Sequence, residues 1–201
     1  DPVEATAFLA SHLRTGTKRR VNVGRANDRH FLFSAGMGLD AEVVKRVEAD
    51  PEAKRRRGEM LFVSNAFGVG FKQYRGADPM ITLEVEGAEP MRVLLAVCCN
   101  ARPFTYFKRF PVDVCPTASL DGELTLFSLT KIRTGTIPRI VWGLFVSRSH
   151  TRWKISNYHE HLTSFGLHAD HPVPMQVDGD YVGEWDSARV VLVREALDLL
   201  V

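Results

Sequence analysis

The chain has 201 residues, of which 45% are hydrophobic and 25% charged, and its formal net charge is +2. These values are typical of a globular protein that can bury a core. The near-neutral charge argues against a dedicated nucleic-acid binder, which is usually more basic, so we expect no nucleic-acid partner.

Residues 2–13 are predicted to form an amphipathic helix. Asp1-Pro2 suits a helix start, because Asp can cap and Pro fits the first turn. Phe8, Leu9 and Leu13 recur at helical spacing, and Gly16 ends the run. The apolar stripe needs a packing partner, so we expect residues 1–16 to belong with a domain other than residues 17–201.

A short strand, a glycine pair and a helix follow one another near residue 36. Strands are predicted over 21–23 and 30–34, and a helix over 41–49, with Gly36 and Gly38 between them. This order is typical of a phosphate-binding turn. The third glycine of a dinucleotide fingerprint and the lysine of a P-loop are missing, so a tight turn that needs two glycines is the favoured interpretation.

The rest of the chain changes from helical to alternating hydrophobic periodicity. Helices are predicted over 58–74 and 134–149, and strands over 81–85, 91–99, 112–115, 124–129, 153–165, 175–177 and 189–193. The predicted fold class is therefore α+β, mainly antiparallel, with a β-sandwich-like domain and a few helices.

The first of two acidic turns contains Asp121-Gly122. A carboxylate in a tight turn, flanked by free backbone carbonyls, suits a hard cation such as Mg²⁺. Ala118 and Glu123 would supply those carbonyls, three residues before Asp121 and two after it. The alternative is a structural type I turn that Asp121 caps.

The second acidic turn is Asp178-Gly179-Asp180. If the flanking strands pair, the two carboxylates project near one point, and their repulsion favours proton uptake by one of them. Such a pair could deprotonate an alcohol that attacks a phosphoryl group. The alternative is a type I′ hairpin with Asp180 in solvent.

Polar and basic residues suggest ligand contacts elsewhere. Asn100 and Arg102 end a buried strand and precede an aromatic stretch, as a ligand rim would; a loop with snorkelling side chains is the alternative. The basic groups at residues 18–20 and 54–57 and at Arg148, Arg152 and Lys154 could together form a face for phosphates or anionic lipid headgroups, although solvated loops are the favoured interpretation of any one of them.

Cysteine usage and hydropathy bear on the compartment. Cys98, Cys99 and Cys115 follow neither a zinc nor a disulfide pattern, which favours a reducing cytoplasm. The longest apolar runs, residues 93–99 and 141–146, are too short to span a membrane.

Taken in order, these segments resemble the C-terminal half of the bacterial diacylglycerol kinase and YegS-like lipid kinase family, which is related to the sphingosine kinases. Residues 31–41 are similar to its FxNxxGxGxDA segment. Asn100 followed by residues 116–124 is similar to N…PxAxxDGxL, and residues 176–180 to QxDGE. The motifs are specific through their combined order and spacing, and the resemblance covers nearly the whole chain.

The resemblance implies a function and a set of roles. Asp121, with the carbonyls of Ala118 and Glu123, would hold a structural Mg²⁺. Asp178 and Asp180 would provide the base; Asp180 stands where the family usually has Glu, so either the base role of residue 180 is weakened or Asp178 carries it. The lipid cleft would include Gly36, Gly38, Asn100 and Arg102.

The family's GGDGT loop, which binds ATP, does not occur in this sequence. We therefore expect ATP to bind a preceding domain, of which residues 1–16 would be the last helix, and the chain alone to be inactive. The expected reaction is transfer of the γ-phosphate to a diacylglycerol-like lipid by a cytoplasmic protein at an anionic membrane surface, and a homodimer is compatible with it. The alternatives are a kinase of sphingoid bases or other lipids, and a non-catalytic β-sandwich that binds lipid or a partner.

Overall fold

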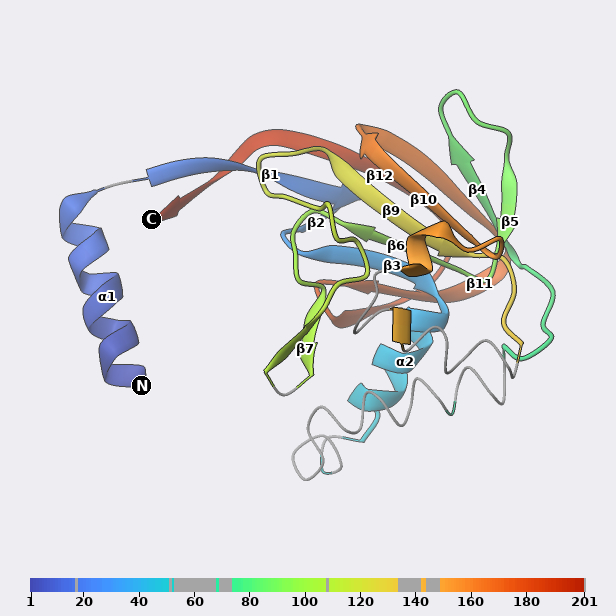
Figure 1. Ribbon diagram of the computed structural model, residues 1–201, viewed down its shortest axis with the longest axis horizontal. Helices are drawn as coiled ribbons and strands as arrows, with labels where there is room; N and C mark the ends of the chain where they lie inside the picture. Colours follow the sequence, from blue (N-terminus) through green and yellow to red (C-terminus); the bar gives the residue numbers. More distant parts are fainter. Residues whose placement is uncertain are drawn as a thin grey trace.

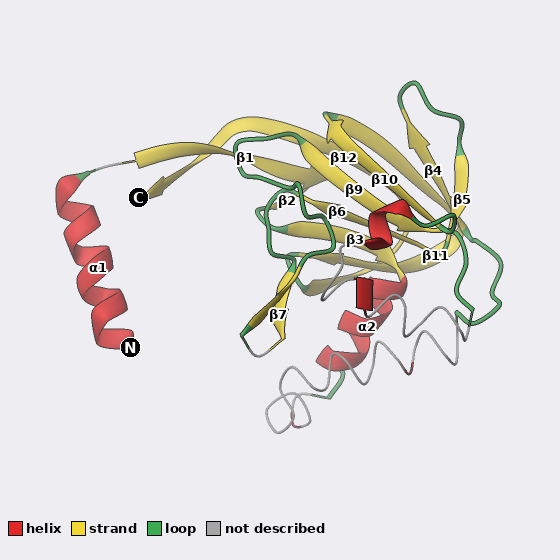
Figure 2. Cartoon of the chain, in the orientation of Figure 1, coloured by secondary structure: helices red, strands yellow, loops and turns green. Residues whose placement is uncertain are grey.

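The computed structural model describes residues 1–16, 18–50, 52, 68, 74–107, 109–133, 142, 143 and 149–200. Figures 1 and 2 show its elements in chain order: α1 (Pro2–Thr15), β1 (Lys18–Ala26), β2 (Arg29–Phe31), β3 (Ser34–Gly38), α2 (Leu39–Glu48), β4 (Ile81–Val85), β5 (Met91–Val93), β6 (Leu95–Cys99), β7 (Thr105–Phe107), β8 (Phe110–Val112), β9 (Leu124–Leu129), η3 (Ser149–Arg152), β10 (Ser156–Leu162), β11 (Ser164–Val177) and β12 (Asp180–Leu200).

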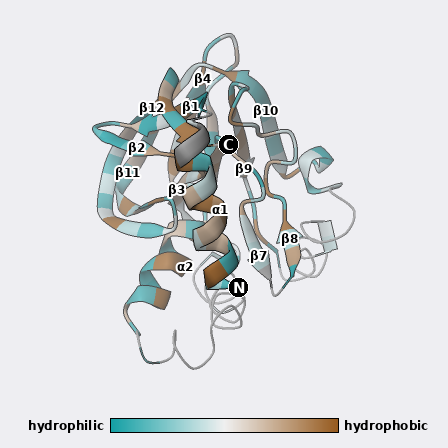
Figure 3. Ribbon diagram, turned by 90° about the vertical axis from the view of Figure 1, so that its left-hand side faces the viewer, coloured by the Kyte–Doolittle hydropathy of each residue, from teal (hydrophilic) through white to brown (hydrophobic). Residues whose placement is uncertain are grey.

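Helix α1 forms as its sequence predicts. The Asp1 side chain accepts a hydrogen bond from the Val3 N–H at 2.8 Å, and Gly16 ends the helix in the left-handed conformation. Its apolar stripe stays at the surface, with Phe8 60% and Leu13 65% exposed, and the helix stands apart from the sheet (Figure 1). Figure 3 shows the hydrophobic residues of α1 in brown. None of the helices in the described ranges has the length and hydropathy needed to cross a membrane.

Within the described residues, ten strands form one sheet in which every pair is antiparallel. Its main path runs β10-β9-β6-β3-β11-β12-β1-β2, and β4 and β5 branch from β11. Strands β7 and β8 form a separate hairpin. The prediction of an α+β fold with a mainly antiparallel sheet is confirmed.

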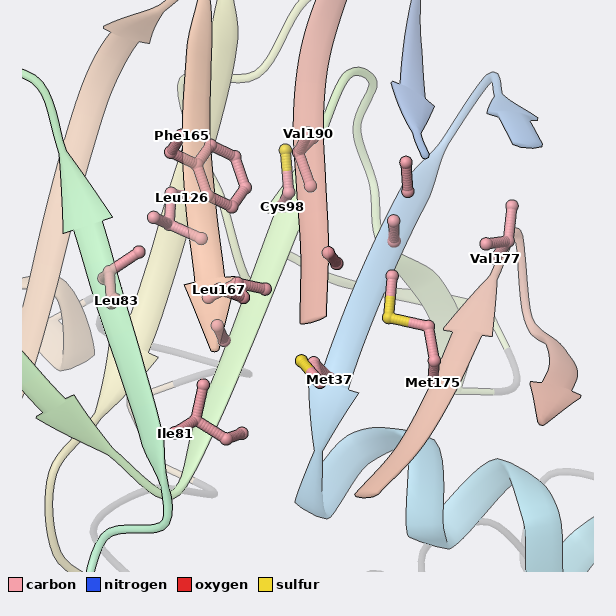
Figure 4. Close-up of a cluster of buried hydrophobic side chains, with 14 of the residues drawn as sticks. Met37, Ile81, Leu83, Cys98, Leu126, Phe165, Leu167, Met175, Val177 and Val190 are labelled. Atoms are coloured by element: carbon pink, nitrogen blue, oxygen red, sulfur yellow. The ribbon is translucent and has the colours of Figure 1, made fainter. Parts of the chain in front are cut away.

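The long strand β11 lets this single sheet curve over its own core. The first half of β11 pairs with β4, and its last residues pair with β3. Strand β12 pairs with both halves, and the register shifts between them. Apolar side chains from the two regions meet in one cluster, of which Figure 4 labels Met37, Ile81, Leu83, Cys98, Leu126, Phe165, Leu167, Met175, Val177 and Val190.

The strand predicted over residues 91–99 is interrupted at Leu94. The Leu94 N–H leaves the expected ladder and donates to the Leu129 carbonyl at 2.7 Å. Among the described strands, β5 then pairs only with β4, whereas β6 pairs with β3 and β9. Hydrophobicity alone does not reveal this break, because Leu94 is as buried as its neighbours.

Two other predicted strands need correction. Only Val112 of the predicted strand 112–115 lies in a strand. Val114 and Cys115 pack in a loop against the outer face of β6, opposite the face that Ala96 and Cys98 turn to the main core. The predicted strand 153–165 starts only at Ser156, because Ser156 Oγ accepts from the Trp153 N–H at 3.1 Å and closes a turn there. It is also divided at Thr163, between β10 and β11. The helices predicted over 58–74 and 134–149 fall almost entirely outside the described residues.

Candidate active site

The Asp178-Gly179 turn joins β11 to β12 as a tight hairpin. Val177 pairs with Asp180, and the two residues between them have φ of 51° and 87°. Positive φ at both central positions is what a type I′ turn requires, so the hairpin alternative describes the backbone correctly. The turn also holds its carboxylates in defined places.

The Asp178 carboxylate accepts three backbone hydrogen bonds from the loop between β2 and β3. The N–H groups of Leu32, Phe33 and Ser34 donate to it at 2.7, 2.7 and 2.9 Å. The Asp178 N–H donates to the Ser34 carbonyl at 2.7 Å. A carboxylate has about four acceptor positions, so Asp178 keeps about one for another partner. Its main contacts fix the loop to the turn.

Asp180 differs from Asp178 in its surroundings. It is the first residue of β12 and is exposed. No hydrogen bond or ion pair engages its side chain within the described part of the chain. The turn therefore combines one carboxylate held by backbone N–H groups with one that is available to a ligand. The sequence predicted both residues but could not distinguish their roles.

Asn100 holds the same loop from the opposite side. Its side chain is fully buried, and Nδ2 donates to the carbonyls of Asn22 and Leu32, each at 2.9 Å. The Asn100 N–H donates to the Phe33 carbonyl at 2.9 Å. Asp178 thus binds the N–H groups of the loop and Asn100 binds its carbonyls, so these two predicted site residues are brought together.

Asn22, which sequence reasoning missed, extends this network to the other acidic turn. Its N–H donates to the Leu120 carbonyl and its Nδ2 to the Gly122 carbonyl, both at 2.9 Å. Its Oδ1 accepts from the Glu195 N–H at 2.9 Å. Hydrogen bonds therefore link the turn at Asp121 to Asn22, then to Asn100 and finally to the loop that Asp178 holds. An isolated Asn in a strand carries no sequence signal for such a role.

The Gly36-Met37-Gly38 segment supports a buried carboxylate. A Cβ on Gly36 would lie 1.8 Å from Asp40 Oδ2, so only glycine leaves room for that side chain. Gly38 has a φ of 93°, and a Cβ there would lie 2.5 Å from the Leu94 carbonyl oxygen. Both glycines are thus required by close contacts within the fold, so the tight-turn interpretation describes this segment better.

Asp40 and Gln176 connect this segment to the hairpin. Gln176 is buried; its Nε2 donates to Asp40 Oδ2 at 3.1 Å, and its Oε1 accepts from the Gly179 N–H at 2.9 Å. Asp40 Oδ1 is buried without a hydrogen-bond partner in the described residues. Burial raises the pKa of Asp40 to about 6, although the bond from Gln176 opposes the shift. Both residues lie inside the quoted motifs, yet their pairing was not predicted.

The raised pKa of Asp40 predicts a pH-dependent stability. The folded state binds the proton more tightly than the unfolded chain, so the free energy of unfolding should fall as pH rises from about 4 to about 6 and stay low above that. The change in the free energy of unfolding that Asp40→Asn causes should therefore be more favourable at pH 8 than at pH 4, by on the order of 2 kcal/mol. Urea unfolding at both pH values measures this difference, and equal effects at both would contradict it.

The remaining predicted residues are engaged in ion pairs. Arg102 Nη2 donates to the buried carboxylate of Asp113 at 3.0 Å, and Arg102 itself is 44% exposed. Glu123 Oε1 accepts from Arg194 Nη2 at 2.6 Å. Arg102 is thus the member of the predicted cleft with an accessible side chain, whereas Glu123 uses its carboxylate within the fold.

Asp121, which the sequence predicts as a Mg²⁺ ligand, forms an ion pair with Arg19. The Asp121 carboxylate is paired with the Arg19 guanidinium, whose Nε donates to Oδ1 at 3.1 Å and whose Nη2 contacts Oδ2. Both side chains are about half exposed, so the pair can open. Hard oxygen donors from Asp121 and from the backbone of Ala118 and Glu123 fit Mg²⁺ in kind, with Arg19 as competitor. Within the described residues, His, Cys, Asp and Glu side chains form no three-ligand cluster.

The fold has known counterparts. Neither the protein-family models nor the curated proteins give a match to the chain. Three solved structures from Bacillus anthracis str. Sterne do: a putative diacylglycerol kinase (TM-score 0.65, 18% identity), a diacylglycerol kinase (0.58, 13%) and another putative diacylglycerol kinase (0.63, 15%).

Each alignment covers 95% of this chain but only 59%, 57% and 60% of the respective counterpart. At these identities the likeness establishes the fold, and it extends over nearly all of the chain. The fold implied by the sequence resemblance is therefore confirmed, and it is that of a part of the bacterial diacylglycerol kinases.

Proposed function

We propose that this chain is the substrate-side part of an ATP-dependent lipid kinase, which transfers the γ-phosphate of ATP to the hydroxyl of a diacylglycerol-like lipid. The shared fold supports the lipid kinase class. The hairpin between β11 and β12 carries the proposal, because it presents the accessible Asp180 carboxylate on a turn fixed through Asp178. A positioned carboxylate can accept the proton of an attacking hydroxyl.

In this mechanism the lipid hydroxyl oxygen forms a bond to the γ-phosphorus while the bond between that phosphorus and the bridging oxygen of ADP breaks. Asp180 accepts the hydroxyl proton, and ADP leaves with the bonding electron pair. Asp178 is a positioning residue, since its three backbone hydrogen bonds hold the turn and the neighbouring loop in one arrangement. Fixing the base in this way lowers the entropy cost of reaching the transition state.

A further domain would bind ATP, and α1 would pack against it. The exposed apolar residues of α1, including Phe8, Leu9 and Leu13, support this proposal because an apolar helix face normally has a partner. Since the lipid substrate lies in a bilayer, the enzyme would work at the surface of an anionic membrane.

Transfer of radiolabelled phosphate by the full-length enzyme tests this function. We expect label from [γ-³²P]ATP to enter diacylglycerol in mixed micelles and not triacylglycerol, which lacks a free hydroxyl. Faster labelling of sphingosine would assign the activity to the sphingoid-base alternative. If neither alcohol is labelled while the protein still binds the micelles, the non-catalytic lipid-binding alternative is correct.

We further propose that Asp121, with the carbonyls of Ala118 and Glu123, holds a Mg²⁺ ion that stabilises this turn. A ligand present at 100 times its Kd stabilises the native state by about 2.7 kcal/mol, which corresponds to roughly 5 °C or more in Tm. We expect a higher Tm in Mg²⁺ than in EDTA, and a larger difference for Arg19→Gln because the competing guanidinium is gone. Asp121→Asn is the control and should have the same Tm in both solutions. If wild type and Arg19→Gln also show no difference in Tm between Mg²⁺ and EDTA, the metal is ruled out.

A further inference from the structure

A basic cavity lies at the end of the sheet where β9 finishes and β10 begins. Its volume is about 380 Å³, within the range of ligand-binding pockets. The described residues that line it are Thr130, Lys131, Arg133, Lys154 and Ile155, of which three are cationic and none is acidic. The composition therefore favours an anionic ligand.

The backbone on both sides of this cavity is firmly held. The Thr130 N–H and Oγ1 both donate to the Ile155 carbonyl, at 2.8 and 3.1 Å. Ile132 is buried in a small cluster beside α2, and its carbonyl accepts from the Gly76 N–H at 3.2 Å. Because the buried Ile132 holds the backbone of this segment, the positions of its two exposed neighbours, Lys131 and Arg133, are fixed at the backbone. The cations are thus mounted on rigid backbone.

Two of the cations are available to a ligand. Neither Lys131 nor Lys154 forms an ion pair with a carboxylate of the described residues. Lysine ammonium groups bind phosphate oxygens as compact charges, and basic pockets of this kind recognise phospholipid headgroups. Unpaired cations around one cavity are therefore suited to a phosphate ester.

A surface tryptophan, linked to the cavity through Gly143 and Trp153, favours a membrane as the source of that phosphate. Trp142 is 62% exposed, and the next residue, Gly143, packs on Trp153, whose ring atoms lie 2.8 Å from where a Gly143 Cβ would be. Trp153 directly precedes Lys154 of the cavity. Exposed tryptophan side chains next to basic groups are typical of proteins that lie at the bilayer interface.

The cavity is separate from the candidate active site. One row of paired residues crosses β3, β6, β9 and β10 and contains Gly38, Leu95, Leu129 and Ser156. The cavity lies at the Ser156 end of this row, about 14 Å from Gly38 at three strand spacings. It is therefore at the end of the sheet where α2 starts. The Asp178 turn lies at the other end of β3, next to Ser34. A ligand in the cavity would therefore not occupy the proposed site of phosphoryl transfer.

We propose that this basic cavity binds a phosphate ester presented by the headgroup of an anionic phospholipid, and so orients the protein on the membrane. The binding needs neither ATP nor the kinase reaction.

Vesicle co-sedimentation at constant ionic strength tests the proposal. The probes are phosphatidylcholine vesicles with and without phosphatidylglycerol, and sn-glycerol 3-phosphate followed by NMR chemical shifts. The test variant is Lys131→Gln/Lys154→Gln. The control is Lys18→Gln/Arg25→Gln, which removes two exposed charges from β1, at the far side of the sheet order.

We expect the wild type to bind vesicles that contain phosphatidylglycerol. The test variant should bind them with about 25-fold lower affinity, or about fivefold per charge removed, and the control with less than about twofold lower affinity. Soluble glycerol phosphate should shift cavity resonances in the wild type only. If glycerol phosphate shifts these resonances but wild type and test variant bind vesicles equally, the cavity is a phosphate site whose ligand is a soluble ester, and the phospholipid part of the proposal is wrong. Equal losses in both double variants, or no binding of either probe, would overturn the proposal. Because no ATP is present, this outcome is independent of the kinase assay.

Discussion

Asp180→Asn is expected to lower the kcat of the full-length kinase by about 10²–10⁴-fold, the usual effect of removing a general base. The amide has nearly the same shape but cannot accept the hydroxyl proton. Because Asp180 is exposed and its side chain has no partner among the described residues, Tm and vesicle binding should not change. Phosphate transfer to diacylglycerol and thermal melting measure the two effects.

Asp178→Asn separates the two carboxylates. It replaces one acceptor oxygen by an NH₂ group that faces the N–H groups of Leu32, Phe33 or Ser34. We therefore expect the free energy of unfolding to fall by about 1–3 kcal/mol, and kcat to fall as well. Asp180→Glu, which restores the family's usual residue, is the control and should keep kcat. Near-native kcat in Asp180→Asn would return the role of base to Asp178.

Local signals made several elements predictable. The cap at Asp1, the glycine at 16 and the 3.6-residue spacing between them define α1 almost to the residue. The run of residues 124–129 lies between a turn and a polar segment, and β9 has those bounds. The antiparallel character follows from short alternating strands separated by tight turns. Each of these features depends on residues close together in the chain.

Contacts between distant residues could not be predicted. Asn100 and Asn22 are 78 positions apart, and Arg19 and Asp121 are 102 apart, so no spacing rule brings them together. The sequence correctly selected Asp178, Asn100 and Asp121 as polar groups at turns and strand ends. It could not reveal that hydrogen bonds link these turns through Asn22, because that depends on how the sheet curves.

Gly36 illustrates how a motif can suggest the wrong occupant. The strand, glycine pair and helix resembled a phosphate-binding turn, yet the carboxylate of Asp40 fills the space beside Gly36. A single-sequence pattern records that a side chain is absent at residue 36 but not what uses the space. The occupant becomes visible only when α2 is placed against β3.

Gly36→Ala should therefore destabilise the protein by about 3 kcal/mol, because its Cβ would lie 1.8 Å from Asp40 Oδ2 and a shift of this buried carboxylate would break its hydrogen bond from Gln176. Gly166→Ala is the matched control: Gly166 also lies in a strand, and its Cβ would meet nothing closer than 3.6 Å. We expect the control to change the free energy of unfolding by less than about 1 kcal/mol.

The decisive comparison is Gly36→Ala in an Asp40→Ala background. With the carboxylate removed, the alanine methyl group has room, so the cost of Gly36→Ala should fall below about 1 kcal/mol and the coupling energy between the two positions should be about 2 kcal/mol. Urea unfolding of the four proteins in this cycle gives the coupling directly. An additive cycle would mean that Asp40 does not occupy the space beside Gly36. The tight-turn interpretation of the glycine pair would then rest on Gly38 alone, and Gly36 would again be a candidate for phosphate binding.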